Sequence, residues 1–265
     1  MGKSMAITVR VLGFPISMGV AFPIFLLLLG YISDLSSIEL VVWVVFGTFA
    51  ILVHELGHAV AFRRYGLEST IAFWGLGGVT IPNDQEAAVR LPDRRWLVVS
   101  LAGPGVGLVL GAIGLALEGA VAGQAADVRS ALGTWTFVNL GWGIFNLLPI
   151  TRLDGGSAVM HLLRLAFGQR GELLALAASI AFSAFVAVLA FANQFVFVAL
   201  VAILFGLADP YQYRALFEGL FPGLAERRRR RDVELNRQRS WWRQVEDEPG
   251  PAWLDGDDQE PRPAP

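Results

Sequence analysis

The sequence has no cysteine and only three histidines among its 265 residues. Without thiols the chain can form neither a disulfide nor a thiolate metal site, so any metal ion must be held by histidine, aspartate or glutamate. Three histidines are also too few for a di-iron membrane oxygenase, which needs many imidazole ligands. The lack of cysteine leaves the redox compartment open.

Charge is scarce as well. Charged residues make up 17% of the chain, hydrophobic residues make up 54%, and the mean hydropathy is +0.53. This composition is typical of an integral membrane protein, because several stretches are long enough to cross about 30 Å of hydrocarbon. Five arginines at 227–231 precede an acidic, proline-rich stretch at 246–265. We interpret the arginines as an anchor to the lipid bilayer, with no nucleic-acid partner, and the acidic stretch as disordered.

Six apolar stretches predict membrane spans. The first four cover residues 19–33, 40–62, 96–117 and 130–151. The uncharged stretch 173–208 is too long for one crossing, and we expect Asn193-Gln194 to divide it into two helices. The alternating segment ITVRVLGFPISM at 7–18 is typical of a strand at the membrane interface. The start of the chain also resembles a signal peptide, but no small-residue cleavage site follows, so we expect a retained helix.

The predicted fold is an all-α polytopic membrane protein with about six transmembrane helices. A small membrane-associated β-hairpin is expected between the second and third, because residues 67–82 alternate and are rich in glycine. We interpret this segment either as a sheet edge that accepts an extended substrate or as a surface loop. The chain is expected to comprise an interfacial segment at 1–18, a six-span membrane domain at 19–217, and a basic, then acidic, disordered cytosolic tail at 218–265.

The distribution of lysine and arginine predicts the orientation. If both termini lie in the cytosol, the external segments 34–39, 118–129 and 193–194 contain one of the 21 basic residues, Arg129. Cytosolic loops are the ones enriched in basic residues. We therefore expect a multi-pass protein of the cell membrane with both termini in the cytosol.

The second predicted span contains the motif HELGH. Polar groups at this depth cost free energy, which favours a functional role. On an α-helix positions i and i+4 share a face, so His54 and His58 can ligate one ion, while Glu55 lies beside them and can act on water. The basic pair at 63–64 places the motif roughly 7 to 13 Å from the cytosolic surface. The motif thus predicts a hydrolytic zinc site inside the membrane but near the cytosol.

A catalytic zinc ion takes three protein ligands and keeps one position for water. The candidates for the third ligand are Asp154, His161, Glu68 and Asp209. Asp154 follows the fourth span at the depth of HELGH, and we expect Gly155-Gly156 to let the backbone approach closely. His161 lies two helical turns further on, among arginines. We therefore prefer Asp154, because a carboxylate oxygen is an ordinary zinc ligand.

Four motifs together resemble a known family. HELGH, the segment WGLGGVTIP, LAGPGVG at the start of the third span and NLLPITRLDGG at the end of the fourth are similar to those of the site-2 proteases, which are intramembrane zinc metallopeptidases. The resemblance covers about residues 5–210 and indicates a compact form without PDZ or CBS domains. It implies one catalytic Zn²⁺ ion, Glu55 as the catalytic residue, and Asn146 as a residue that positions substrate or stabilises the oxyanion. The implied zinc ligands are His54, His58 and Asp154.

The same resemblance implies a zinc metalloendopeptidase that performs regulated intramembrane proteolysis. Its substrate would be a single-pass membrane protein, such as an anti-sigma factor or a membrane-tethered transcription factor, cut near the cytosolic face. Two alternatives remain: a membrane-embedded zinc protease acting on soluble or lipidated peptides, and a non-catalytic metal-binding or transport protein. A transporter would show ligands at several depths, whereas these lie at one. The stripe Gly103, Gly107 and Gly111 favours packing within the monomer, and it also allows a homo-oligomer.

Overall fold

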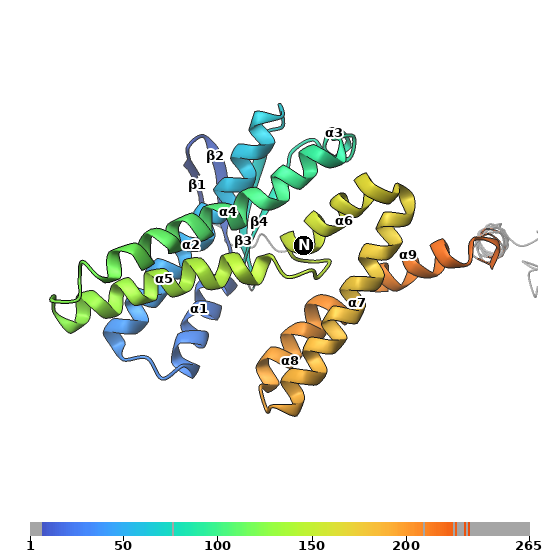
Figure 1. Ribbon diagram of the computed structural model, residues 1–265. Coiled ribbons are helices and arrows are strands. Elements are labelled where there is room, and N and C mark those ends of the chain that lie inside the picture. The colour runs from blue at the N-terminus through green and yellow to red at the C-terminus, as the bar shows by residue number, and fades with distance from the viewer. Residues whose placement is uncertain are drawn as a thin grey trace, which may run out of the picture. The chain divides into compact units, whose positions relative to one another are not determined.

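The computed structural model describes residues 7–75, 77–208 and 210–224, together with positions 226, 231 and 233. The chain divides into one unit that ends at Gln212 and a second that begins at Tyr213. The elements, shown in Figure 1, are β1 (Ile7–Val11), β2 (Phe14–Met18), α1 (Ala21–Ile32), α2 (Ser37–Arg64), β3 (Ser69–Trp74), β4 (Gly77–Pro82), α3 (Gln85–Val89), α4 (Asp93–Glu118), α5 (Ala126–Asn146), α6 (Asp154–Phe167), α7 (Gln169–Ala192), α8 (Val196–Ala202), a π-helical turn (Ile203–Leu207) and α9 (Pro210–Leu220).

Three helices in the described part of the chain, α2, α4 and α7, are long and apolar enough to cross a membrane. The apolar helices Ala21–Ile32 and Val198–Leu207 are shorter. The prediction of a mostly helical fold with helices able to span a membrane is therefore confirmed. The number of six crossings stays a prediction.

Two predicted helix boundaries can be compared with the structure. The long apolar stretch is divided where expected, because α7 ends at Ala192 and Gln194 has a left-handed backbone with φ of +65°. The fourth predicted span was too long, since α5 ends at Asn146 instead of continuing to Thr151. The reason is Pro149, which has no N–H for a helical hydrogen bond and disfavours helix in the residue before it.

A four-stranded sheet corrects the expectation of an all-α fold. Its order is β1-β2-β3-β4, with β1–β2 and β3–β4 antiparallel and β2–β3 parallel. Within the segment 67–82, β3 and β4 form an antiparallel hairpin, whose association with the membrane stays a prediction. The segment at 7–18 is a second hairpin instead of a single strand. Parallel pairing of β2 with β3 requires a crossover, which α1 and α2 supply. Within the described sheet β4 pairs with β3 alone, so its other edge is free.

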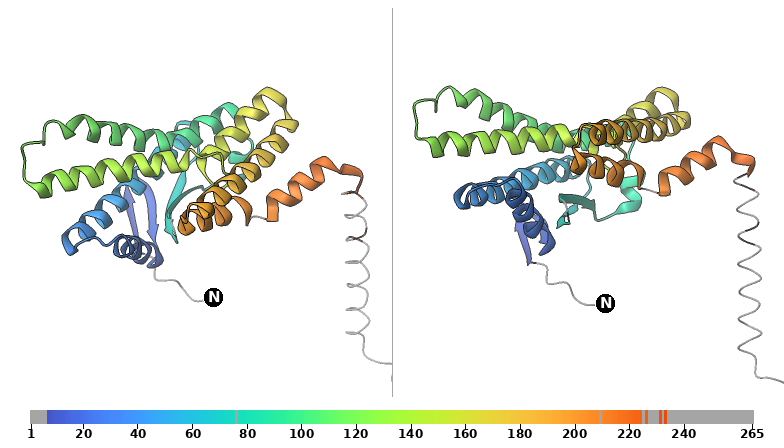
Figure 2. Two further views of the ribbon diagram at one scale, coloured as in Figure 1. Left: turned by 60° about the horizontal axis from the view of Figure 1, so that its bottom comes forward. Right: turned by 90° about the horizontal axis from the view of Figure 1, so that it is seen from below.

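The hydrophobic core joins this sheet to α2. Phe14 of β2 and Ile71 of β3 are fully buried, and they cluster with Phe22 of α1 and with Ile51 and Ala59 of α2. Figure 2 shows the strands on one side of α2 and the pair α4 and α5 on the other. The sheet and two helices therefore enclose the half of α2 that carries HELGH.

Two glycines of the stripe on α4, Gly107 and Gly111, pack against α5 of the same chain, and the third, Gly103, packs against α2. A Cβ atom at Gly107 would lie 3.1 Å from the carbonyl oxygen of Asn139, and one at Gly111 would lie 2.5 Å from Cγ of Leu140. Figure 1 shows these two helices side by side. The stripe is thus used for packing within the monomer, and a homo-oligomer stays a prediction.

The second unit is described in its first part. In α9, Arg214 Nε lies 2.9 Å from Glu218 Oε1, one helical turn away, and the rings of Phe217 and Phe221 are in contact. Most of the predicted tail at 218–265, including four of the five arginines and the acidic stretch, lies outside the described residues. The division of the chain into parts at 1–18, 19–217 and 218–265 stays a prediction.

Candidate metal centre

Helix α2 brings two histidines together in a buried position. The Nε2 atoms of His54 and His58 lie 3.2 Å apart, as the i, i+4 spacing requires. Their exposed fractions are 2% and 6%, and that of Glu55 between them is 4%. Buried polar groups need partners or a ligand, so this cluster is a candidate site on energetic grounds.

Asp154 completes the cluster from a distant part of the chain. Its Oδ2 atom lies 3.0 Å from Nε2 of His54 and 3.2 Å from Nε2 of His58. Tetrahedral zinc with ligand bonds of about 2.0 to 2.1 Å requires ligand atoms about 3.3 Å apart. The observed spacing therefore fits zinc, and two imidazoles with one carboxylate are an ordinary catalytic donor set that leaves one position open. His54, His58 and Asp154 are thus a possible metal site.

Asp154 is the first residue of α6 and lies outside the three long apolar helices. Burial alone would raise the pKa of its carboxyl, but the hydrogen bonds with His54 and His58 lower that pKa to about 2. A negative charge is also favoured at the N-terminus of a helix. The side chain is therefore an anion at neutral pH, which is the form that ligates zinc.

Two glycines after Asp154 make room for the preceding loop. A Cβ atom on Gly155 would collide with the carbonyl of Leu147, and one on Gly156 would collide with the carbonyl of Ile150. The glycines therefore let the loop at 147–153 fold tightly against α6, whereas the sequence suggested a close approach of backbone to the metal. The same loop is tied to α7, because the backbone N–H of Thr151 donates to Oγ of Ser179 over 2.9 Å.

The orientation of His58 is fixed by α4. Its Nδ1–H donates to the carbonyl oxygen of Val99 over 2.7 Å, so Nε2 is the ring nitrogen that faces His54 and Asp154 and that would give up its proton on binding a metal ion. Such a second hydrogen bond sets the tautomer of metal-binding histidines. A Cβ atom on Gly103 would collide with the His58 ring, so a glycine is required at that position.

Glu55 is held by the strand β4. The hydroxyl of Thr80 lies 2.7 Å from Oε2 of Glu55, and a Cβ atom on Gly78 would lie 2.5 Å from its Cγ. Neither contact can be inferred from the sequence. Alternation in the strand does place Gly78 and Thr80 on one face, but it does not reveal which helix that face meets.

Asn146 is at the end of α5 and is 8% exposed. Its Nδ2 donates to the carbonyl oxygen of Trp142 over 3.0 Å, one turn back in the same helix. The Trp142 ring packs edge-on against His54, with ring centroids 6.4 Å apart. The end of α5 thus lies near the histidine pair, and the role of Asn146 toward substrate stays a prediction.

The other candidate ligands lie elsewhere. Nδ1 of His161 is bonded to Oδ1 of Asp93 over 2.7 Å, and its ring stacks on Trp96 with centroids 5.5 Å apart. Glu68 is exposed and lies 3.5 Å from the guanidinium of Arg63. Asp209 lies outside the described residues.

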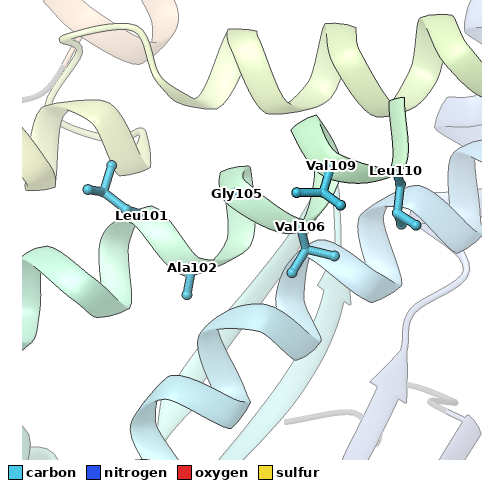
Figure 3. Close-up of a pocket in the computed structure, with 6 residues that line it drawn as sticks. All are labelled: Leu101, Ala102, Gly105, Val106, Val109 and Leu110. Atoms are coloured by element: carbon cyan, nitrogen blue, oxygen red, sulfur yellow. The ribbon is translucent and has the colours of Figure 1, made fainter. Parts of the chain in front are cut away.

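A groove of about 430 Å³ runs along α4, apart from these ligands. Its lining, shown in Figure 3, has no polar side chain: Leu101, Ala102, Gly105, Val106, Val109 and Leu110. These side chains offer no group that could move a proton or polarise a carbonyl in the hydrolysis predicted from the sequence.

No protein-family model matches the chain. The chain is 27% identical to a zinc metalloprotease of Methanocaldococcus jannaschii over 165 residues, which are 60% of this chain and 45% of that protein. It is 38% identical over 113 residues to Rip3 of Mycobacterium tuberculosis, named as a candidate zinc metalloprotease, with 42% of this chain and 28% of that protein covered. The solved structure of a site-2 protease from Methanocaldococcus jannaschii matches with a TM-score of 0.53 and 24% identity, over 75% of this chain and 90% of that one.

The resemblance to the site-2 proteases is confirmed. The chain is a homologue of zinc metalloproteases and has the site-2 protease fold. It spans less than half the length of these two sequence relatives.

Proposed function

We propose that the chain is a zinc-dependent intramembrane endopeptidase that cuts transmembrane segments of membrane-tethered regulatory proteins near the cytosolic face. One observation carries the proposal. The ligand atoms of His54 and His58 on α2 and of Asp154 on α6 lie within 4.8 Å of one another, and α2 is long and apolar enough to cross a membrane. The homology to zinc metalloproteases supports zinc as the metal and peptide hydrolysis as the reaction.

The chemistry divides between the metal and the chain. Bound zinc supplies Lewis acidity toward water and toward the scissile carbonyl. Glu55, next to the first ligand, takes a proton from the attacking water and returns it to the leaving nitrogen. Asn146 donates an amide N–H to the oxyanion or to the substrate backbone. One water is consumed, the peptide C–N bond breaks, and a carboxylate and an amine are released.

The proposal includes a topology. We place six crossings in the membrane with both termini in the cytosol, since 20 of the 21 basic residues then lie in the cytosol. Arg63-Arg64 at the end of α2 mark the cytosolic side, so the site is roughly 7 to 13 Å below that surface. Water reaches this depth from the cytosol more readily than from the outer face.

A transmembrane substrate must unwind before it can be cut, because a helix hides its carbonyls in its own hydrogen bonds. Unwinding is easier at glycine, proline or asparagine. The free edge of β4 lies next to Glu55 and can pair with the exposed backbone, as in strand addition to a sheet. The cut then falls in the cytosolic half of the span and releases a cytosolic fragment, such as an anti-sigma factor or a transcription factor.

The test begins with a Glu55→Gln variant in the native cell. Membrane proteins that accumulate uncut are the candidate substrates, and mass spectrometry locates the cut in each. We expect cuts in the cytosolic half of a span and slower cutting when its helix-breaking residues are replaced by leucine. A cut near the outer face, or cutting indifferent to these leucines, contradicts the proposal. Efficient cutting of soluble unfolded polypeptides alone supports a membrane-embedded protease of soluble peptides instead.

A further inference from the structure

We propose that Thr80 is a positioning residue for Glu55, which rests on the proposed function. The hydroxyl of Thr80 lies 2.7 Å from Oε2 of Glu55 and 3.0 Å from its main-chain oxygen. Threonine is the donor, because a carboxylate and a carbonyl only accept, and its single hydroxyl proton is directed at Oε2, the nearer oxygen, or shared between the two. The side chain that acts on water is therefore held by a group on a neighbouring strand.

The two oxygens of the Glu55 carboxylate have different surroundings. Oε2 accepts the Thr80 hydroxyl, whereas Oε1 lies beside Gly78, where an added Cβ atom would be 2.8 Å away. Gly78 and Thr80 are two residues apart on β4 and face the same side of the sheet. The strand thus holds one oxygen and, by having no side chain at Gly78, leaves space at the other.

This arrangement matters because the terminal torsion of glutamate is broad and is not fixed by rotamer preference. A base must present a lone pair to water in a defined direction, and a hydrogen bond to Oε2 restricts rotation of the carboxylate. In the described residues the hydrogen bonds of the Thr80 hydroxyl go to Glu55 and not to the three ligand atoms, so its loss should leave the metal in place. We expect the hydroxyl to act on turnover and not on zinc binding.

The experiment compares Thr80→Val, which keeps the shape and removes the donor, with Thr80→Ser, which keeps the donor. The probe is a membrane-inserted reporter helix with an Asn-Pro pair in its cytosolic half, which we expect the wild type to cut and Glu55→Gln to leave intact. We expect Thr80→Val to lower kcat about 10- to 100-fold with KM and zinc content unchanged, and Thr80→Ser to restore most of kcat.

Thr70→Val is the matched control. Thr70 is on the neighbouring strand β3, and its hydroxyl donates to Oδ1 of Asn83 over 3.0 Å. This variant removes a side-chain hydrogen bond from the same sheet without touching Glu55, so kcat should stay at the wild-type value. Equal loss of kcat in both threonine-to-valine variants would reduce Thr80 to a structural residue of the sheet and overturn the proposal.

A second readout does not depend on any substrate. Thermal unfolding of the zinc-loaded protein is measured for Thr80→Val in the wild-type and Glu55→Ala backgrounds, which forms a double-mutant cycle. We expect a loss of a few degrees with Glu55 present and a smaller loss without its carboxylate. Equal losses, full kcat in Thr80→Val, or no rescue by serine would each contradict the role of Thr80. Cutting by Glu55→Gln, or no cutting by wild type, would instead overturn the proposed function. The double-mutant cycle would still show whether Thr80 interacts with the Glu55 carboxylate.

Discussion

Gly103 of α4 lies directly against the imidazole of His58, and a side chain at this position would collide with the ring. Two residues further on, Gly105 has open space around it, since an added Cβ atom would meet no atom within 4 Å. Two glycines of one helix therefore have different functions. The first leaves room for His58, a proposed zinc ligand, and the second has space for a side chain.

The first prediction is that Gly103→Ala lowers zinc affinity by about 100-fold, since His58 must leave its position. Gly105→Ala should bind zinc like the wild type and is the matched control, because alanine also favours the helix. Zinc content after dialysis against a graded chelator measures the effect. Normal zinc affinity in Gly103→Ala would contradict the prediction, because it would show that α2 and α4 can move apart enough to accommodate a methyl group.

The second prediction concerns Glu55, the proposed catalytic carboxylate. Glu55→Gln should retain zinc and lose cleavage by a factor on the order of 10⁴, because an amide cannot take a proton from water. Metal analysis beside a cleavage assay measures both. Glu68→Gln makes the same substitution at an exposed site and should cut normally. Parallel loss of zinc in Glu55→Gln would make Glu55 a structural residue.

The third prediction separates the candidate ligands. Asp154→Ala should lose zinc, while His161→Ala should keep it, because the His161 imidazole is bonded to Asp93 and stacked on Trp96. His161→Ala should instead lower the melting temperature, as Asp93 loses a buried partner. Measuring zinc content and thermal unfolding for both variants tests this assignment of the third ligand. Loss of zinc in His161→Ala with retention in Asp154→Ala would reverse the ligand assignment.

The fourth prediction is that removing zinc destabilises the protein. A ligand that binds the folded state stabilises it by about 2.7 kcal/mol at a free concentration 100 times its Kd. Chelation should therefore lower the melting temperature, and added Zn²⁺ should restore it. Asp154→Ala should respond to neither treatment. A melting temperature that is independent of zinc in the wild type would contradict a bound metal in the folded protein.

The local part of the site can be read from the sequence because it depends on one helix. The i, i+4 spacing of His54 and His58 fixes their common face wherever α2 lies. Composition likewise predicts the long apolar helices, and Pro149 explains where the fourth span stops. The position of Asp154 relative to the motif, 96 residues from His58, was inferred from membrane depth and from the family resemblance.

The remaining features depend on packing between distant elements, which periodicity does not encode. Thr80 contacts Glu55 only because the parallel pairing of β2 with β3 places β4 beside α2. Val99 and Gly103 orient His58 only because α4 lies against α2 at that height. The sequence by itself determined which residues can hold a metal within one helix. The tertiary structure decided which groups orient them, because those contacts arise from long-range packing and not from local spacing.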